Sequence, residues 1–214
     1  MNFPLVFFDC DGVLIFDLLW SDLNQTLGIS AKQDKEWYED YYQGRLSFKE
    51  WNERIEKYYR KNKLKKRQFE RCLNNFSLNP EAKELVDFLH QKGVKTAIIS
   101  SGIDFYVKKV AQKLGISLWR ANYSFIFDKK GDFVKMKYLT DDPQAKVLHI
   151  KEICQELSIR PTKTVYIGDS INDYQAFKLT QRGVLYKGDD KRLIKICWLK
   201  VDNLLELKRY LGRD

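Results

Sequence analysis

The sequence predicts an α/β fold, in which a doubly wound parallel sheet carries a small all-helical domain inserted after its first strand. Apolar runs of strand length begin at residues 3, 96 and 164, and each run ends in small or acidic polar residues. Segments with helical periodicity separate the later runs, and such alternation of strand and helix favours a parallel sheet. Residues 123–138 are an exception, because residues 129–132 predict a turn between two short strands and therefore a hairpin. Residues 15–78 show helical spacing of apolar side chains without strand alternation, which predicts the helical insertion.

The first apolar run ends in two carboxylates, Asp9 and Asp11, and Gly12 follows them. Residues i and i+2 of an extended chain point to the same side, so both carboxylates are expected to face one site. Gly12 allows the chain to turn sharply. Neighbouring carboxylates repel each other unless a cation or a proton lies between them, which predicts a metal site or an acid–base pair. A single pair of this kind is more often a polar turn, so the prediction of a functional site depends on the later motifs as well.

Before the second apolar run, Asn79 and Pro80 are expected to begin a helix. The second apolar run ends in Ser100, Ser101 and Gly102, and a helical pattern that stops at Gly115 follows. A hydroxyl group and backbone N–H groups at the start of a helix form an anion-binding site. The alternative is that Ser100 is an ordinary N-cap of that helix.

The third apolar run, residues 164–168, is followed by Asp169 and Asp173. Lys146 lies near the start of a predicted helix, where the helix dipole favours anions, and its alternative role is a solvated surface lysine. Ligands of open α/β sheets bind beyond the carboxyl ends of the strands. Asp9, Ser100 and Asp169 are therefore expected at one edge of the sheet.

In this order the residues resemble the four motifs of the haloacid dehalogenase superfamily of phosphotransferases, which read D-x-D, Ser/Thr, Lys and G-D-x-x-x-D. The sequence has D-C-D-G-V from Asp9, S-S-G from Ser100, Lys146, and G-D-S-I-N-D from Gly168. Two further segments, residues 42–48 and 120–122, are similar to the phosphoserine phosphatase branch. The resemblance implies a Rossmann-like catalytic core of residues 1–14 and 79–214. It also implies a helical cap of residues 15–78 that closes over the site and excludes water.

The resemblance further implies a Mg²⁺-dependent phosphomonoester hydrolase that acts on a small phosphorylated metabolite through an aspartyl-phosphate intermediate. Asp9 would be the nucleophile, and Asp11 would be the general acid and then the general base. Ser100, with the N–H groups of Ser101 and Gly102, would bind the phosphoryl oxygens. Lys146 would bridge the phosphate and Asp9.

The same resemblance implies a Mg²⁺ site formed by Asp9, Asp169 and the backbone carbonyl of Asp11. Asp173 would also belong to the metal site, where it would orient Lys146 or a metal-bound water. Asn172 would contact the phosphate or the rest of the substrate.

The substrate stays open at this point. In phosphoserine phosphatases a Glu after the first motif binds the amino group and a cap Arg binds the carboxylate. Those positions fall on Leu18 and Ile55 of this sequence, beside Asp17 and Arg54. Phosphoserine and another small phosphorylated metabolite are both compatible with this pattern. So is a phosphotransferase or mutase that passes the phosphoryl group to a second hydroxyl.

The 38 Lys and Arg residues outnumber the 29 Asp and Glu residues, which gives a net charge of +9, and residues 57–67 are strongly basic. A nucleic-acid surface is one interpretation of that basic segment. A solvated face that attracts anionic metabolites is preferred, because the segment lacks a glycine–aromatic RNA-binding signature.

Composition and spacing also limit the other classes of function. No apolar run approaches the roughly 20 residues of a membrane helix, and no secretory signal precedes the first strand. The four cysteines show no paired spacing, and the two histidines lack metal-ligand spacing. We therefore expect a cytoplasmic protein with reduced thiols, monomeric or homodimeric, without membrane or nucleic-acid partners.

Overall fold

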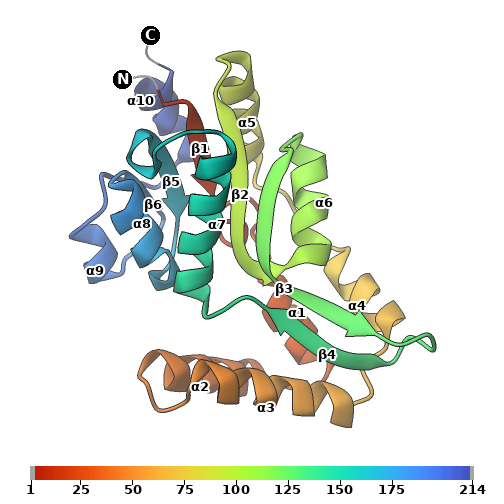
Figure 1. Cartoon of the computed structure of the whole chain (residues 1–214). Helices are drawn as coiled ribbons and strands as arrows, with labels where there is room; N and C mark the ends of the chain where they lie inside the picture. Colours follow the sequence, from red (N-terminus) through yellow and green to blue (C-terminus); the bar gives the residue numbers. More distant parts are fainter. Residues whose placement is uncertain (1–2, 213–214) are drawn as a thin grey trace. The chain divides into compact units, whose positions relative to one another are not determined.

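The computed structural model describes residues 3–212, which fall into two compact units (Figure 1). The core unit comprises Met1–Asp17, Ser77–Asn122 and Leu139–Asp214. The inserted unit comprises Leu18–Phe76 and Tyr123–Tyr138. In residues 3–212 the longest helices are too short and too polar to cross a membrane.

A seven-stranded mixed sheet forms the framework, with the strand order β4-β3-β2-β1-β5-β6-β7. Central strand β1 pairs in parallel with β2 and β5, so the strand order reverses beside β1 and creates a topological switch point there. β3 and β4 form the antiparallel hairpin that the sequence predicts, and the α/β prediction is confirmed. The strands are β1 (Leu5–Phe8), β2 (Lys95–Ile103), β3 (Leu118–Phe127), β4 (Phe133–Tyr138), β5 (Thr164–Gly168), β6 (Gly183–Tyr186) and β7 (Leu199–Val201).

Helices cover both faces of the core sheet (Figure 1). The side chains of Leu5 and Phe7 pack in one buried cluster with Ile150 and Ile153 of α7. Because neighbouring strand residues point to opposite faces, the side chains of Val6 and Phe8 are buried on the other face. The core helices are α5 (Pro80–Gln91), α6 (Asp104–Leu114), α7 (Asp142–Glu156), α8 (Tyr174–Thr180), α9 (Lys191–Ile194) and α10 (Lys208–Leu211).

The predicted ends of two core helices are confirmed. Asn79 caps α5 by accepting a hydrogen bond from the backbone N–H of Glu81, and Pro80 occupies the first turn. Gly115 ends α6 with a φ of +68°, a conformation that other residues adopt only at a cost.

The inserted unit contains α1 (Leu19–Thr26), α2 (Ala31–Tyr42), α3 (Phe48–Lys61) and α4 (Lys66–Leu73). Ser47 and Glu50 form a capping box at the start of α3, and the apolar face of α3 buries Trp51, Ile55 and Tyr59.

The hairpin belongs to the inserted unit, whereas the division made from the sequence left residues 123–138 with the core. The physical reason is aromatic packing. Phe125 lies against Phe69 with ring centroids 4.9 Å apart, and Phe133 lies edge-on to Tyr59 at 5.5 Å. These contacts join segments that are distant in sequence, so local periodicity does not reveal them.

Candidate active site

Asp9 follows the central strand at the switch point of the sheet. It continues the alternation of Leu5 and Phe7, so its side chain points toward the α7 face. Its backbone N–H donates to the carbonyl of Ile167 at 2.8 Å, and its Oδ1 accepts from the backbone N–H of Cys10 at 2.8 Å. The residue is only 4% exposed. Asp9 is therefore fixed by β1 and β5 before any ligand is considered.

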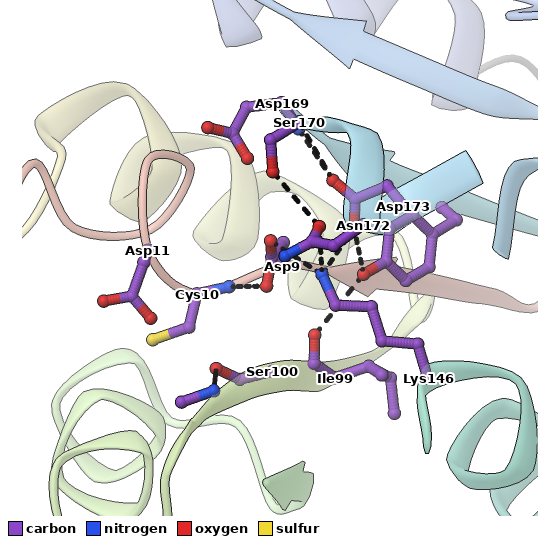
Figure 2. Close-up of polar contacts among 12 residues, drawn as sticks. Asp9, Cys10, Asp11, Ile99, Ser100, Lys146, Asp169, Ser170, Asn172 and Asp173 are labelled. Atoms are coloured by element: carbon purple, nitrogen blue, oxygen red, sulfur yellow. Dashed lines mark hydrogen bonds and ion pairs between the residues drawn. The ribbon is translucent and has the colours of Figure 1, made fainter. Parts of the chain in front are cut away.

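Lys146 lies on the buried face of α7 and is completely inaccessible to solvent. It is one turn before Ile150, so the helix directs it toward the sheet as it directs the apolar residues. Its Nζ lies 2.9 Å from Asp9 Oδ2, 2.6 Å from Asp173 Oδ1 and 3.0 Å from Asn172 Oδ1 (Figure 2). The alternative of a solvated surface lysine is wrong.

Two neighbouring carboxylates explain why the charged side chain of Lys146 can be buried. Burial acts to lower the pKa of Lys146, but the carboxylates of Asp173 and Asp9 raise it well above its ordinary value. The ammonium group therefore stays charged beside Asp9.

Asp173 is held by four hydrogen-bond donors. Its Oδ1 accepts from Lys146 Nζ and from the hydroxyl of Tyr166 at 2.8 Å. Its Oδ2 accepts from the backbone N–H groups of Asp169 at 3.0 Å and Ser170 at 3.2 Å. Gly168 leaves room for this carboxylate, because a Cβ at Gly168 would lie 2.2 Å from Asp173 Oδ2. The backbone thus holds Asp173 through Oδ2, and Oδ1 contacts Lys146.

Asp9, Asp169 and Asp173 have carboxylate oxygens within 4.8 Å of one another, and hard oxygen donors of this kind suit Mg²⁺. Burial raises the pKa of Asp9 well above its usual value, and burial followed by the charge of Asp173 raises the pKa of Asp169 to about 7. Three carboxylates face one ammonium group, so the donor set fits an added cation. Asp173 accepts from four donors and Asp9 from two, so Asp173 is the more fully engaged of these two carboxylates.

Asp11 lies in the turn after β1 and outside that carboxylate group. Figure 2 shows its carboxylate directed away from the Asp9–Lys146 pair. β1 ends at Phe8, so the alternation that was expected to bring Asp9 and Asp11 to one side does not extend to Asp11. Gly12 has a φ of +76°, and a Cβ there would lie 2.3 Å from Asp169 Oδ2. The turn therefore passes close to Asp169 and needs glycine for both reasons.

The segment Ser100–Gly102 is extended, because β2 continues to Ile103. The alternative that Ser100 caps α6 is wrong, since the N-cap is Ile103. Ser100 is 1% exposed, and its Oγ accepts from the backbone N–H of Gly102 at 2.9 Å. The Oγ of Ser101 is buried without a hydrogen-bond partner within the described residues. Figure 2 places Ser100 on the strand beside Asp9.

Two tyrosines join this site that sequence reasoning missed. Tyr166, on β5, donates to Asp173, and Tyr106, on α6, donates from its hydroxyl to Asp11 Oδ2 at 2.6 Å. The spacing of apolar residues predicts only that both tyrosines are buried. Because a buried tyrosine hydroxyl usually has a hydrogen-bond partner, this burial was the one indication in the sequence of a polar contact. Asn172 contacts Lys146 and also accepts from Ser170 Oγ at 3.1 Å.

The model of the haloacid dehalogenase-like hydrolase family matches residues 3–179 of this chain, a span that contains all of these residues. The chain belongs to this family. Family membership and its relatives make it a phosphatase, similar to the phosphoserine phosphatase branch.

The relatives support that placement. A phosphoserine phosphatase of Streptococcus thermophilus is 28% identical over 186 residues, which cover 85% of this chain and 83% of the relative. A phosphoserine phosphatase of Methanocaldococcus jannaschii is 25% identical over 211 residues, 97% of each chain.

Solved structures share the fold. The structure of a phospho-aspartyl intermediate analogue of phosphoserine phosphatase matches with a TM-score of 0.81 and 21% identity, covering 99% of this chain and all of that one. A HAD family hydrolase from Salmonella enterica matches with a TM-score of 0.84 and 16% identity, covering this whole chain and 72% of that one.

Proposed function

We propose that this protein is a Mg²⁺-dependent phosphomonoester hydrolase that acts on a small phosphorylated metabolite through an aspartyl phosphate on Asp9. The observation that carries the proposal is the buried Lys146 ammonium group, held between Asp9 and Asp173. A charge buried this completely needs partners, and here the partners keep it beside the proposed nucleophile.

In the proposed reaction, a carboxylate oxygen of Asp9 forms a bond to phosphorus while the bond from phosphorus to the leaving oxygen breaks. Asp11 gives its proton to that oxygen. Water then attacks phosphorus, Asp11 takes a proton from the water, and the bond from Asp9 to phosphorus breaks, releasing inorganic phosphate. Bound Mg²⁺ would supply positive charge against the phosphate, held by Asp9 and Asp169 with the backbone carbonyl of Asp11.

Two groups of the chain would stabilise the developing charge. Lys146 places a fixed ammonium next to Asp9, and Ser100 with the N–H groups of Ser101 and Gly102 would bind the phosphoryl oxygens. For this binding the hydrogen bond from Gly102 N–H to Ser100 Oγ would have to open.

Phosphoserine is the first substrate to test, because the relatives bear that name. Leu18 and Ile55 occupy the positions that the resemblance assigns to the amino-group and carboxylate contacts. Their charged neighbours already have partners: Asp17 accepts from the backbone N–H of Ser77 at 2.6 Å, and Arg54 lies 5.5 Å from the centre of the Trp37 ring. The alternative is a substrate other than phosphoserine, and a panel of phosphorylated metabolites distinguishes the two.

The insertion after the first motif supports the proposal of a mobile cap. The chain leaves the core unit after Asp17 and returns at Ser77. Within the inserted unit, three cations of the basic segment pair with carboxylates: Arg60 with Glu56, Lys65 with Asp132 and Lys66 with Glu70. These pairs favour the interpretation of the basic segment as a solvated cap face rather than as a nucleic-acid surface.

The deciding experiment measures free phosphate released from a panel of phosphorylated metabolites, with Mg²⁺ and with a chelator. We expect Mg²⁺-dependent release, and we expect radiolabelled phosphate to be trapped on the protein by acid quenching. Asp9→Asn should abolish both signals while preserving the far-ultraviolet circular dichroism spectrum. Turnover that survives chelation, or a label that never attaches to Asp9, contradicts the proposal. Transfer to an added acceptor without phosphate release indicates a phosphotransferase.

A further inference from the structure

Tyr106 is buried among apolar side chains, but its hydroxyl contacts a carboxylate of the proposed active site. It lies on the buried face of α6 with Val110 and Leu114, and it is completely inaccessible to solvent. Its hydroxyl nevertheless reaches the carboxylate of Asp11 and donates to Oδ2 at 2.6 Å. This contact joins residues 95 positions apart in the sequence.

The close approach of the phenol requires glycine at position 102. A Cβ on Gly102 would lie 1.8 Å from the Tyr106 hydroxyl oxygen and 3.0 Å from Ser100 Oγ. The hydroxyl of Tyr106 therefore lies against the segment expected to bind phosphate, and it reaches Asp11 from there. α6 begins at Asp104, directly after β2, so the phenol is carried on a continuous strand–helix segment. Groups held on regular elements of this kind are positioned more accurately than groups on loops.

The hydroxyl is buried and donates to this carboxylate. The χ2 rotation of an aspartate is intrinsically broad, so a hydrogen bond to Oδ2 restricts the orientation of the Asp11 carboxyl group.

We propose that Tyr106 is a positioning residue that fixes the carboxyl group of Asp11 for its two proton transfers; this inference rests on the proposed function. With Oδ2 accepting the phenol proton, the acidic proton of Asp11 resides on Oδ1. Oδ1 gives that proton to the leaving oxygen as the bond to phosphorus breaks, and Oδ1 then accepts a proton from the attacking water. Without the phenol, Oδ2 loses this donor and the proton is divided between the two oxygens of the carboxyl group.

The test compares Tyr106→Phe with the wild type on phenyl phosphate and para-nitrophenyl phosphate. The two substrates are similar in shape, but nitrophenolate departs without a proton, whereas phenolate, whose parent phenol resembles tyrosine with a pKa of about 10, gains from one. The quantity measured is kcat/KM, which covers the steps through departure of the leaving group. We expect a fall of about tenfold for phenyl phosphate, a part of the 10²–10⁴-fold typically supplied by general acids. For para-nitrophenyl phosphate we expect a change of less than about twofold.

Two comparisons separate positioning from loss of structure. Tyr186 is also fully buried in the core unit and donates to a carboxylate, Glu81 Oε2 at 3.2 Å, so Tyr186→Phe should leave both substrates unaffected. In an Asp11→Asn background, Tyr106→Phe should cause no further loss on phenyl phosphate, because the two residues act through one proton.

The outcomes are distinguishable. An equal fall on both substrates, no fall on either, or full additivity with Asp11→Asn overturns the role of Tyr106 while leaving the proposed hydrolase intact. A wild-type protein that releases no phosphate from any substrate overturns the proposed function itself.

If Tyr106→Phe does not fold, a crystal structure of the wild type with a metal-fluoride phosphate mimic decides the question. The Tyr106 hydroxyl should still contact Asp11 Oδ2 while Oδ1 faces the mimic. A phenol turned away from Asp11 would overturn the role.

Discussion

At the scale of single residues, the site depends on charged groups that burial would make costly if they were unpaired. Lys146 is fully buried, and it is stable there because Asp9 and Asp173 lie within 2.9 Å of its Nζ. Removing one member of a buried ion pair typically costs about 3–5 kcal/mol, because the remaining charge has no partner. The same interactions thus contribute to the stability of the fold and to the proposed chemistry.

Replacing the lysine should therefore affect both properties. We expect Lys146→Met to abolish phosphate release and to lower the free energy of unfolding by about 3 kcal/mol, since two carboxylates lose their cation. Denaturant titration and the phosphate assay measure the two effects. Lys151→Met is the matched control, because Lys151 lies exposed on the same helix; a similar loss there would argue against the pairing.

Asp142 predicts a pH dependence of stability. Burial raises its pKa from 3.8 to about 7, against the hydrogen bond from Asn122 and the charge of Lys146. Because the folded protein holds this proton more tightly than the unfolded chain, stability falls as pH rises from about 4 to about 7 and is then constant. The gap between the two pKa values corresponds to about 4 kcal/mol as an upper value.

Asp142→Asn isolates this effect, because an amide oxygen can still accept from Asn122 Nδ2, which lies 2.8 Å from Asp142 Oδ1. The variant should match the wild type near pH 4.5 and become progressively more stable than the wild type up to about pH 7. Chemical denaturation at several pH values measures the difference. A constant difference across that range would contradict the raised pKa.

At the scale of elements, the ends of strands and helices position the functional groups. β5 ends at Gly168 and the chain then turns through a 3-10 helix, Ile171–Asp173, which brings Asp173 back over the strand end. Gly115 follows the last residue of α6. Among the described residues, nothing lies within 4 Å of the position that a Cβ would occupy at Gly115. Two glycines thus end elements of the core for different reasons, close packing in one case and backbone conformation in the other.

Substitution by alanine separates these reasons. Gly168→Ala should reduce kcat by at least about 100-fold, because the new methyl group displaces Asp173 and a small misplacement of catalytic groups costs about that much. Gly115→Ala should cost about 1 kcal/mol of stability and leave kcat unchanged, since only the left-handed conformation is affected. Kinetics and thermal unfolding of both variants measure this; equal kcat values for the two would contradict the role of Gly168.

At the scale of the whole molecule, the net charge of +9 coexists with a group of three carboxylates, of which Asp9 and Asp173 are buried. The overall positive charge favours the approach of anionic phosphates. The local excess of negative charge favours a cation, since the charge of Asp173 adds to the effect of burial in raising the pKa values of Asp9 and Asp169.

Mg²⁺ should therefore stabilise the folded protein. At a concentration of about 100 times its dissociation constant, we expect a rise in Tm of roughly 5 °C over the chelated protein. In Asp169→Asn the rise should disappear, while the metal-free variant should be more stable than the metal-free wild type because one of three neighbouring negative charges is removed. Asp202→Asn, at an exposed aspartate, is the control. A Tm that is insensitive to Mg²⁺ in the wild type would contradict the metal site.

The sequence by itself determined the α/β class, the hairpin, the helix ends at Asn79 and Gly115, and the strand-end positions of Asp9 and Asp169. These features depend on periodicity, on turn and cap chemistry, and on where an apolar run stops, all of which are local properties of the chain.

Only the tertiary structure decided that Lys146 is buried, that Asp173 is engaged by four donors, and that Tyr106 and Tyr166 contact functional carboxylates. It also grouped residues 123–138 with the inserted unit and extended β2 through Ser100. Each of these outcomes depends on contacts between residues far apart in the chain. Local spacing sets the direction of a side chain, and only packing sets its partner.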